Sequence, residues 1–292
     1  MDNYLGLFFA FLALVAWTIG DWNIQRATRT VGNWKSLFFI GFVGALGIFP
    51  FIGGELVSLF QNPRGLLLLT ILAVITLVSA LFLFEGLKRG KFAIIEPVFG
   101  LELPFTVAFS IIFAGEHLAP LVYFLIAFIF IGLLLTVSKS FEHLRFHKTV
   151  FEQGVFFAVI GSVGMGLMNF LTGFGSQTLS PLLTIWFVHT ALAICCLAYL
   201  AISGEAKNLW RDLRANRNII LSESLFDNVA WISYATSMTL IPISIATAVS
   251  ESYIALTVLI GVLVNKERLK AHQIFGACCV VFGVVILSFY TS

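Results

Sequence analysis

Residues 118–138 read LAPLVYFLIAFIFIGLLLTVS, an uncharged apolar run as long as a helix that crosses a bilayer. About 20 such residues span the hydrocarbon core as an α-helix. Similar runs recur along the chain, and the spans are expected at 4–24, 34–52, 66–87, 92–113, 118–138, 154–175, 181–202, 219–240, 243–264 and 272–290. Barrel strands are excluded, because the runs are too long and do not alternate with a period of two. The predicted fold class is an all-α integral membrane protein with ten transmembrane helices.

The composition excludes several classes of function. Of the 292 residues, 59% are hydrophobic and only 11% are charged, whereas about one quarter of a soluble domain is charged. This excludes a soluble enzyme, a nucleic-acid binder and a disordered chain. The sequence has no HExxH, GxSxG, P-loop or CxxC motif, so we predict neither an enzyme nor a cofactor. The adjacent cysteine pairs, Cys195-Cys196 and Cys278-Cys279, lack the spacing of zinc ligands, and no metal site is predicted.

The basic residues predict the orientation. All of the 17 Lys and Arg residues except Arg64 lie in alternate connectors, namely those after the first, third, fifth, seventh and ninth spans. Cytoplasmic loops carry the excess of Lys and Arg, so both termini are expected on the non-cytoplasmic side of a bacterial-type inner membrane. Asp2 is the only charge before Asp21, and the first segment therefore reads as a retained span rather than a signal peptide.

The two halves of the chain resemble each other. Gly6-Leu7-Phe8-Phe9-Ala10 matches Gly154-Val155-Phe156-Phe157-Ala158 at a shift of 148 residues, which places Asp21 opposite Asn169. Toward the end of each half the shift is 151, where Glu116-His117-Leu118 matches Glu267-Arg268-Leu269. Five spans per half invert the second copy in the membrane, an architecture of many secondary transporters. The expected organisation is a first repeat at 1–138, a cytoplasmic linker at 139–153 and a second repeat at 154–292.

With these features the sequence resembles the drug/metabolite transporter superfamily, in its EamA-domain branch. The resemblance rests on the five-plus-five spans, on the turns Gly115-Glu116-His117-Leu118 and Lys266-Glu267-Arg268-Leu269, and on the entry span that contains Trp17-Thr18-Ile19-Gly20-Asp21. It implies that small metabolites, amino acids or cations move between two inverted halves. The chain differs from many similar proteins in its uncharged end, Ser288 to Ser292, and in the side on which its basic connectors lie.

Acidic residues inside the spans are the first candidates for a site. Glu102 and Glu251 lie near the middle of their spans, Asp227 follows Glu223 on one helix face, and Asp21 lies nearer a span end. A charge near the bilayer centre costs several kcal/mol and usually serves function. Such carboxyl groups can carry protons and attract cations. The alternatives are structural: a protonated Glu bonded between helices, or ion pairs of Asp21 with Arg26 and of Glu223 or Glu96 with cytoplasmic lysines or arginines.

Residues 96–104, EPVFGLELP, place two prolines around a glycine within the fourth span. Proline removes a helical hydrogen bond and bends a helix. We therefore predict a kink in this span, with Glu102 at a central cavity.

Aromatic and amide side chains would complete the site. Trp17, Trp231 and Tyr253 lie deep enough to line an apolar pocket and could contact an ammonium group through their ring faces. Asn169 could hydrogen-bond a solute. For His189, a packed and hydrogen-bonded side chain is the favoured interpretation.

The predicted function is a secondary transporter of an amino acid, amine or other cationic or amphipathic solute, working by alternating access with protons as the candidate coupling ion. The alternatives are an uncoupled facilitator, a membrane enzyme or flippase subunit that acts on a lipid-linked substrate, and an assembly subunit. The expected partners are the solute, the lipid bilayer and protons, without nucleic acid, and the chain is expected as a monomer or homodimer. The sequence leaves the substrate, the direction of transport and the oligomeric state open.

Overall fold

The computed structural model describes residues 2–89, 98–137, 153–256 and 270–291. These residues form twelve α-helices and two short 3-10 helices, η1 (Phe49–Phe51) and η3 (Ala206–Asn208). The α-helices are α1 (Asp2–Thr30), α2 (Asn33–Ile48), α3 (Gly53–Phe60), α4 (Pro63–Arg89), α6 (Glu102–Ala114), α7 (Pro120–Val137), α8 (Gln153–Thr178), α9 (Pro181–Ile202), α10 (Leu209–Ala215), α11 (Arg217–Leu240), α12 (Ile243–Ser250) and α14 (Ala271–Thr291). The all-helical fold is confirmed.

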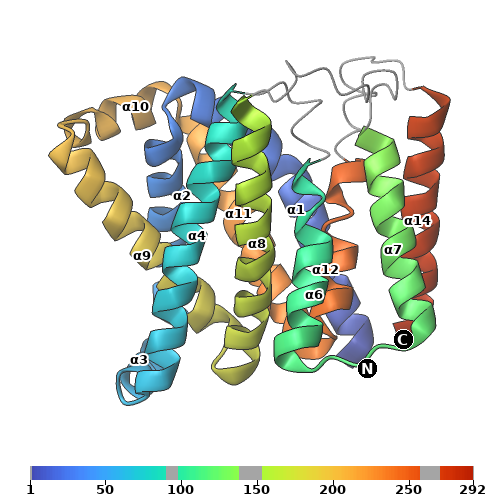
Figure 1. The fold of residues 1–292 in the computed structure, drawn as a ribbon. Helices are drawn as coiled ribbons and strands as arrows, with labels where there is room; N and C mark the ends of the chain where they lie inside the picture. The colour runs from blue at the N-terminus through green and yellow to red at the C-terminus, as the bar shows by residue number, and fades with distance from the viewer. Residues whose placement is uncertain (1, 90–97, 138–152, 257–269, 292) are drawn as a thin grey trace.

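Ten of these helices form the bundle, and each occupies one of the expected spans (Figure 1). The other two, α3 and α10, lie at opposite ends of the bundle and were not expected from the sequence. Nine of the bundle helices are apolar enough to lie in a membrane, five of them over a full span. The tenth, α11, is long but too polar to be counted among them.

Local sequence explains where several helices begin and end. Pro63, Pro120 and Pro181 each occupy the first position of a helix, where the missing N–H leaves no bond unmade. Ser180 caps α9 by accepting a hydrogen bond from the backbone N–H of Leu183 at 3.1 Å. Gly115 ends α6 with a φ of 65°, a left-handed conformation that glycine adopts without a steric penalty.

Helix pairing shows the symmetry of two inverted repeats. Exchanging α1, α2, α4, α6 and α7 for α8, α9, α11, α12 and α14 turns the α1–α11 pair into the α8–α4 pair. The same exchange relates the α6–α8 contact to α12–α1, and it leaves the pairs α2–α9 and α7–α14 unchanged. Every one of these contacts is present, so helices from both halves interleave around a common centre.

The fourth span is interrupted, as its prolines predict. Val98 and Phe99 are helical, Gly100 and Leu101 form a turn, and α6 then begins at Glu102. Residues 90–97, including Glu96 and Pro97, lie outside the described residues. The described residues thus show an interruption of this span at Gly100-Leu101, beside the predicted cavity residue Glu102.

The ninth span is interrupted too, which was not expected from the sequence. Helix α12 ends at Ser250, Glu251 and Ser252 form a turn, and residues 253–256 are helical again. Gly100-Leu101 and Glu251-Ser252 are 151 residues apart, the shift that relates the ends of the two repeats. Both halves therefore break the equivalent helix at the equivalent place.

Close backbone approach holds the interleaved halves together. A Cβ added to Gly161 of α8 would lie 2.9 Å from the backbone N of Leu83 in α4. A Cβ on Gly166 would lie 3.1 Å from the carbonyl oxygen of Glu102. Small residues at such crossings let membrane helices approach closely. These glycines thus let α8 pack closely against α4 and α6.

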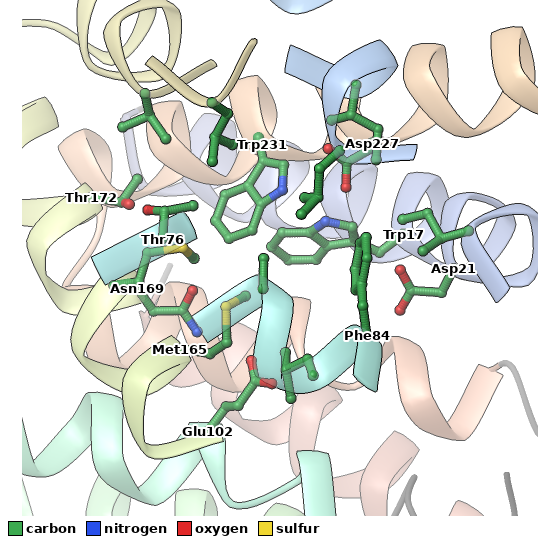
Figure 2. Close-up of a pocket in the computed structure, with 18 of the residues that line it drawn as sticks. Trp17, Asp21, Thr76, Phe84, Glu102, Met165, Asn169, Thr172, Asp227 and Trp231 are labelled. Atoms are coloured by element: carbon green, nitrogen blue, oxygen red, sulfur yellow. The ribbon is translucent and has the colours of Figure 1, made fainter. Parts of the chain in front are cut away.

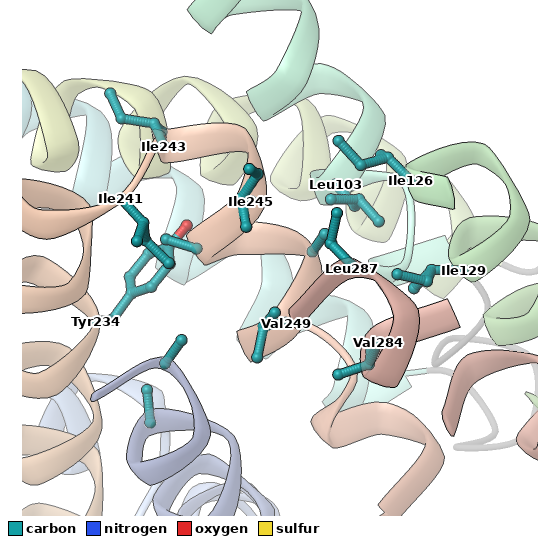
Figure 3. Packing of buried hydrophobic residues seen from close by; sticks show 14 of the residues in the cluster. Leu103, Ile126, Ile129, Tyr234, Ile241, Ile243, Ile245, Val249, Val284 and Leu287 are labelled. Atoms are coloured by element: carbon teal, nitrogen blue, oxygen red, sulfur yellow. The ribbon is translucent and has the colours of Figure 1, made fainter. Parts of the chain in front are cut away.

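A cluster of buried hydrophobic side chains joins α6 and α7 of one half to α11, α12 and α14 of the other (Figure 3). Its labelled members include Leu103 and Ile129 from the first half, and Val249, Val284 and Leu287 from the second. At the α10 end of the bundle, Lys35 of α2 forms ion pairs with Glu205 and Asp212 at 2.5 and 2.9 Å. Polar and apolar contacts thus connect the two halves at different levels.

Candidate functional site

A cavity of about 130 Å³ lies at the centre of the bundle. Figure 2 shows its wall, which receives side chains from α1, α2, α4, α6, α8, α9 and α11, and from the interrupted segments at residues 99 and 251–253. All eight residues that the sequence analysis singled out lie on this wall: Trp17, Asp21, Glu102, Asn169, Asp227, Trp231, Glu251 and Tyr253. The structure therefore brings all eight of these residues to one place.

Four acids face the cavity, and no lysine or arginine does so among the described residues. Among the described lining residues, only His189 could carry a positive charge. A low-dielectric enclosure lined by one sign of charge raises the local concentration of ions of the opposite sign. The arrangement can therefore hold a cation or exchange protons, and it disfavours an anion.

Three of the acids gather on one side, which we call the acidic wall: Asp21, Asp227 and Glu251. They come from α1, α11 and the turn after α12, and α1 contacts both of the other helices. Asp21 interacts electrostatically with Asp227 and with Glu251, and its side chain is hydrogen-bonded to Tyr253. These carboxyl groups thus form one local cluster. No group of described residues has the geometry of a metal site.

The opposite side, which we call the amide wall, consists of Thr76 of α4 and Asn169 of α8, and Glu102 of α6 lies between the two walls (Figure 2). Figure 2 shows Asn169 and Thr76 across the cavity from Asp21 and Asp227. The Thr76 hydroxyl donates to the Leu72 carbonyl at 2.8 Å. Asn169 is only 1% exposed, and within the described part of the chain neither its side-chain nitrogen nor its side-chain oxygen has a hydrogen-bond partner.

Aromatic rings line the cavity beside the acidic wall. The Trp17 and Trp231 rings meet edge to face, with centroids 4.9 Å apart and an interplanar angle of 78°. The Trp17 ring also lies 6.0 Å from that of Tyr253. An indole face beside carboxyl groups can stabilise an ammonium group. The aromatic rings and the acids therefore both favour a positively charged ligand.

The repeat shift reproduces most of the wall. Lining residues in equivalent positions are Trp17 and Met165, Asp21 and Asn169, Ile24 and Thr172, Leu37 and Ile185, and Ile40 and Val188 at a shift of 148, and Thr76 and Asp227, Ala80 and Trp231, and Glu102 and Tyr253 at a shift of 151. The cavity therefore lies on the two-fold axis that relates the halves. The positions match, but the chemistry differs between the two sides.

This symmetry identifies wall residues that the sequence analysis did not single out. Thr76 is the counterpart of Asp227, Met165 that of Trp17, and Thr172 that of Ile24. Each could have been found by applying the repeat shift to a candidate or to its neighbour on the same helix face.

His189 is packed and hydrogen-bonded, as expected. Its Nδ1 lies 2.7 Å from Oδ1 of Asn228, whose amide nitrogen donates to the carbonyl oxygens of Ile40 and Ser224 at 3.0 and 2.7 Å. The ring also reaches the cavity wall. His189 therefore links the cavity to a polar contact between α2, α9 and α11.

Two ion pairs that the sequence left open as structural alternatives are absent among the described residues. Arg26 lies over the ring of Trp22, with its guanidinium carbon 4.6 Å from the ring centroid, and forms no ion pair with Asp21. Glu223 is fully buried and accepts a hydrogen bond of 2.7 Å from the Ser36 hydroxyl, again without an ion pair. The described residues therefore show other contacts for Arg26 and Glu223 in place of these ion pairs.

Glu116, from the turn that the two halves share, caps a helix of the opposite half. Its carboxylate accepts hydrogen bonds from the backbone N–H groups of Ile243 and Ser244, at 2.6 and 3.3 Å, and from the Ser244 hydroxyl. These residues begin α12, whose far end leads into Glu251. Its repeat counterpart, Glu267, lies outside the described residues. Glu116 thus fixes the helix that places one acid at the cavity.

Replacing Glu116 with alanine is expected to destabilise the protein by about 1–2 kcal/mol, since it removes a charged helix cap. The melting temperature in detergent should fall, measured by loss of the monodisperse peak after heating. The control is His117→Ala, which changes an exposed neighbour. Equal melting temperatures for the two variants would show that the cap contributes nothing.

Comparison with known proteins agrees with this architecture. The model of the EamA-like transporter family matches residues 4–138 and 152–289. Twenty-eight chains of solved structures match the fold. One of them, titled "Crystal structure of protein", superimposes with a TM-score of 0.75 at 15% identity and covers 98% of this chain and 97% of its own. At that identity the likeness shows the fold alone. No curated relative matches the chain in sequence.

Proposed function

The chain belongs to the EamA-like transporter family, and from this premise we propose that it moves a small cationic or amphipathic solute, such as an amine or amino acid, by proton-coupled alternating access. The observation that carries the proposal is the central cavity with four acids and no described lysine or arginine on its wall. The family membership supports a transporter in the membrane. The solute and the coupling ion are inferred from the chemistry of the wall.

The proposed binding mode assigns a role to each candidate residue. The acidic wall of Asp21, Asp227 and Glu251, together with Glu102, receives the positive charge of the solute. Trp17, Trp231 and Tyr253 contact its apolar part and the adjoining ammonium group. These are proposals that the shared location of the side chains supports.

Coupling would follow from competition for the same carboxyl groups. A carboxylate that binds an ammonium group cannot hold a proton at the same oxygen, so solute and proton occupy the acids in turn. Glu102 and Glu251 are the proposed exchange groups, because each lies at the interruption of its span. A helix interruption in a transporter commonly lines the solute site.

We also propose the orientation that the basic residues predict, with both termini on the non-cytoplasmic side of an inner membrane. Lys35, Arg211 and Arg214 gather with α10 at one end of the bundle, whereas both termini lie at the other end (Figure 1). Because one chain encloses the cavity, we propose that a monomer suffices for transport.

The proposal is tested with purified protein in proteoliposomes. Uptake of a labelled amine is measured with and without an imposed pH gradient, for the wild type and for Glu102→Gln and Glu251→Gln. We expect the pH gradient to accelerate uptake by the wild type. It should have no effect on uptake by either glutamine variant. The control is Asp2→Asn, an exposed acid far from the cavity. Unchanged transport in both glutamine variants would reject the assigned roles, and uptake insensitive to the gradient in the wild type would identify an uncoupled facilitator.

A further inference from the structure

The side-chain amide of Asn169 is not satisfied by any residue that the structure describes. The side chain is 1% exposed, and among the described residues neither of its polar atoms has a hydrogen-bond partner. Buried polar groups in native proteins are nearly always paired. Since Asn169 lies on the cavity wall and points across it (Figure 2), the partner is expected to arrive with the solute.

The position of Asn169 in the repeat indicates what kind of group its amide binds. It is the repeat counterpart of Asp21, so the two halves place a carboxamide and a carboxylate of the same size at equivalent points of the wall. Thr76 likewise faces the cavity as the neutral counterpart of Asp227. Two of the three acids of the acidic wall, Asp21 and Asp227, thus have neutral hydrogen-bonding counterparts on the amide wall.

An amide offers both a donor and an acceptor. A second ammonium group on the solute would offer only hydrogen-bond donors, so it could not accept a hydrogen bond from the Asn169 N–H. A carboxylate would face the Asn169 oxygen and the nearby acids. A hydroxyl or carboxamide group can instead donate to the oxygen and accept from the nitrogen.

We propose that the solute carries one positive charge and, at its other end, a neutral group that both donates and accepts hydrogen bonds, and that Asn169 selects this group. The inference rests on the proposed function and specifies its substrate class. The ammonium end lies against the acidic wall, and the neutral end pairs with Asn169 on the amide wall. The preferred class is thus a monocationic amine with a hydroxyl or carboxamide, rather than a diamine or a zwitterion.

The test compares three probes of equal chain length, 4-aminobutanamide, 1,4-diaminobutane and 4-aminobutanoate. Binding is measured by calorimetry on the full-length protein in detergent at fixed pH. The wild type should prefer the carboxamide over the diamine by about tenfold, the effect of roughly one hydrogen bond. Asn169→Asp makes the second wall acidic and should invert this preference. Asn218→Asp, which adds the same charge at an exposed site away from the cavity, should leave it unchanged.

A second variant separates ligand recognition from folding. Asn169→Leu keeps the size but removes both polar atoms, so the carboxamide preference should disappear while the melting temperature without ligand stays equal or rises. A lower melting temperature with the preference retained would overturn the inference in favour of a structural role. Tighter wild-type binding of the diamine or the zwitterion would overturn it as well. If the wild type binds none of the amines, the proposed function itself fails. If the wild type binds them but Asn169→Asp leaves the preference unaltered, only the inference about Asn169 fails.

Discussion

Transport of a cationic solute is expected to fall by about ten- to a hundredfold when Asp227 is replaced by asparagine, because a hydrogen bond to a charged group contributes about 1.5–3 kcal/mol. Asp227 is 6% exposed, lines the cavity and interacts electrostatically with Asp21. Asparagine preserves the size of the side chain and removes the charge. The repeat counterpart, Thr76, cannot replace that charge because it is neutral.

Initial uptake rates in proteoliposomes, corrected for the amount of reconstituted protein, measure this effect. Asp2→Asn serves as the control, since it makes the same change at an exposed position. Thr76→Val, on the amide wall, should reduce transport far less. If Asp227→Asn took up every cationic solute tested at the wild-type rate, this result would contradict the acidic wall as the binding surface.

Gly44→Ala is expected to lower stability by about 2–4 kcal/mol, through overpacking and the loss of a buried hydrogen bond. A Cβ at this position would lie 2.0 Å from Oδ1 of Asn228 and 2.3 Å from Nδ1 of His189. These are the two atoms of the bond that joins α9 to α11. The methyl group therefore separates them and displaces His189 at the cavity wall.

Gly47→Ala provides the matched control, because it lies on the same helix and a Cβ there would meet nothing within 4 Å. Its melting temperature in detergent should equal or exceed that of the wild type, since alanine favours the helix over glycine. Solute affinity should fall in Gly44→Ala alone. Equal stability of both alanine variants would show that the His189–Asn228 contact is dispensable.

Hydropathy was sufficient to predict the ten bundle helices. The run at 118–138 forms α7 at Pro120–Val137, and the expected span at 181–202 coincides with α9. Backbone pairing in lipid permits little besides a helix for such runs. The prolines on either side of Gly100 also gave a local reason for the interruption in the fourth span.

The ninth span shows where this approach fails. Its interruption at Glu251-Ser252 has no proline within it, and a run of about 20 apolar residues reads as continuous whether or not one turn is broken. Only the repeat shift connects it with Gly100-Leu101. The helices α3 and α10 were missed because seven or eight residues are too few to give a span signal.

The candidate site was located from the sequence because acids and aromatic residues are conspicuous within apolar runs. Which of them share a wall was not predictable, since it depends on how helices of the two halves interleave. The cluster of Asp21, Asp227 and Glu251 arises because α1 packs on both α11 and α12. The unpaired amide of Asn169 required the same knowledge of its surroundings.

The polarity of α11 has a consequence for biogenesis. An acidic residue at the centre of an isolated helix costs about 2.5–3.5 kcal/mol during translocon-mediated insertion, and α11 carries both Glu223 and Asp227. The nascent helix is therefore a poor candidate for entry into lipid on its own. Its neighbours α1, α2, α8 and α9 precede it in synthesis and contact it in the finished bundle. The order of synthesis thus predicts that α11 enters the membrane after these four helices and by packing against them.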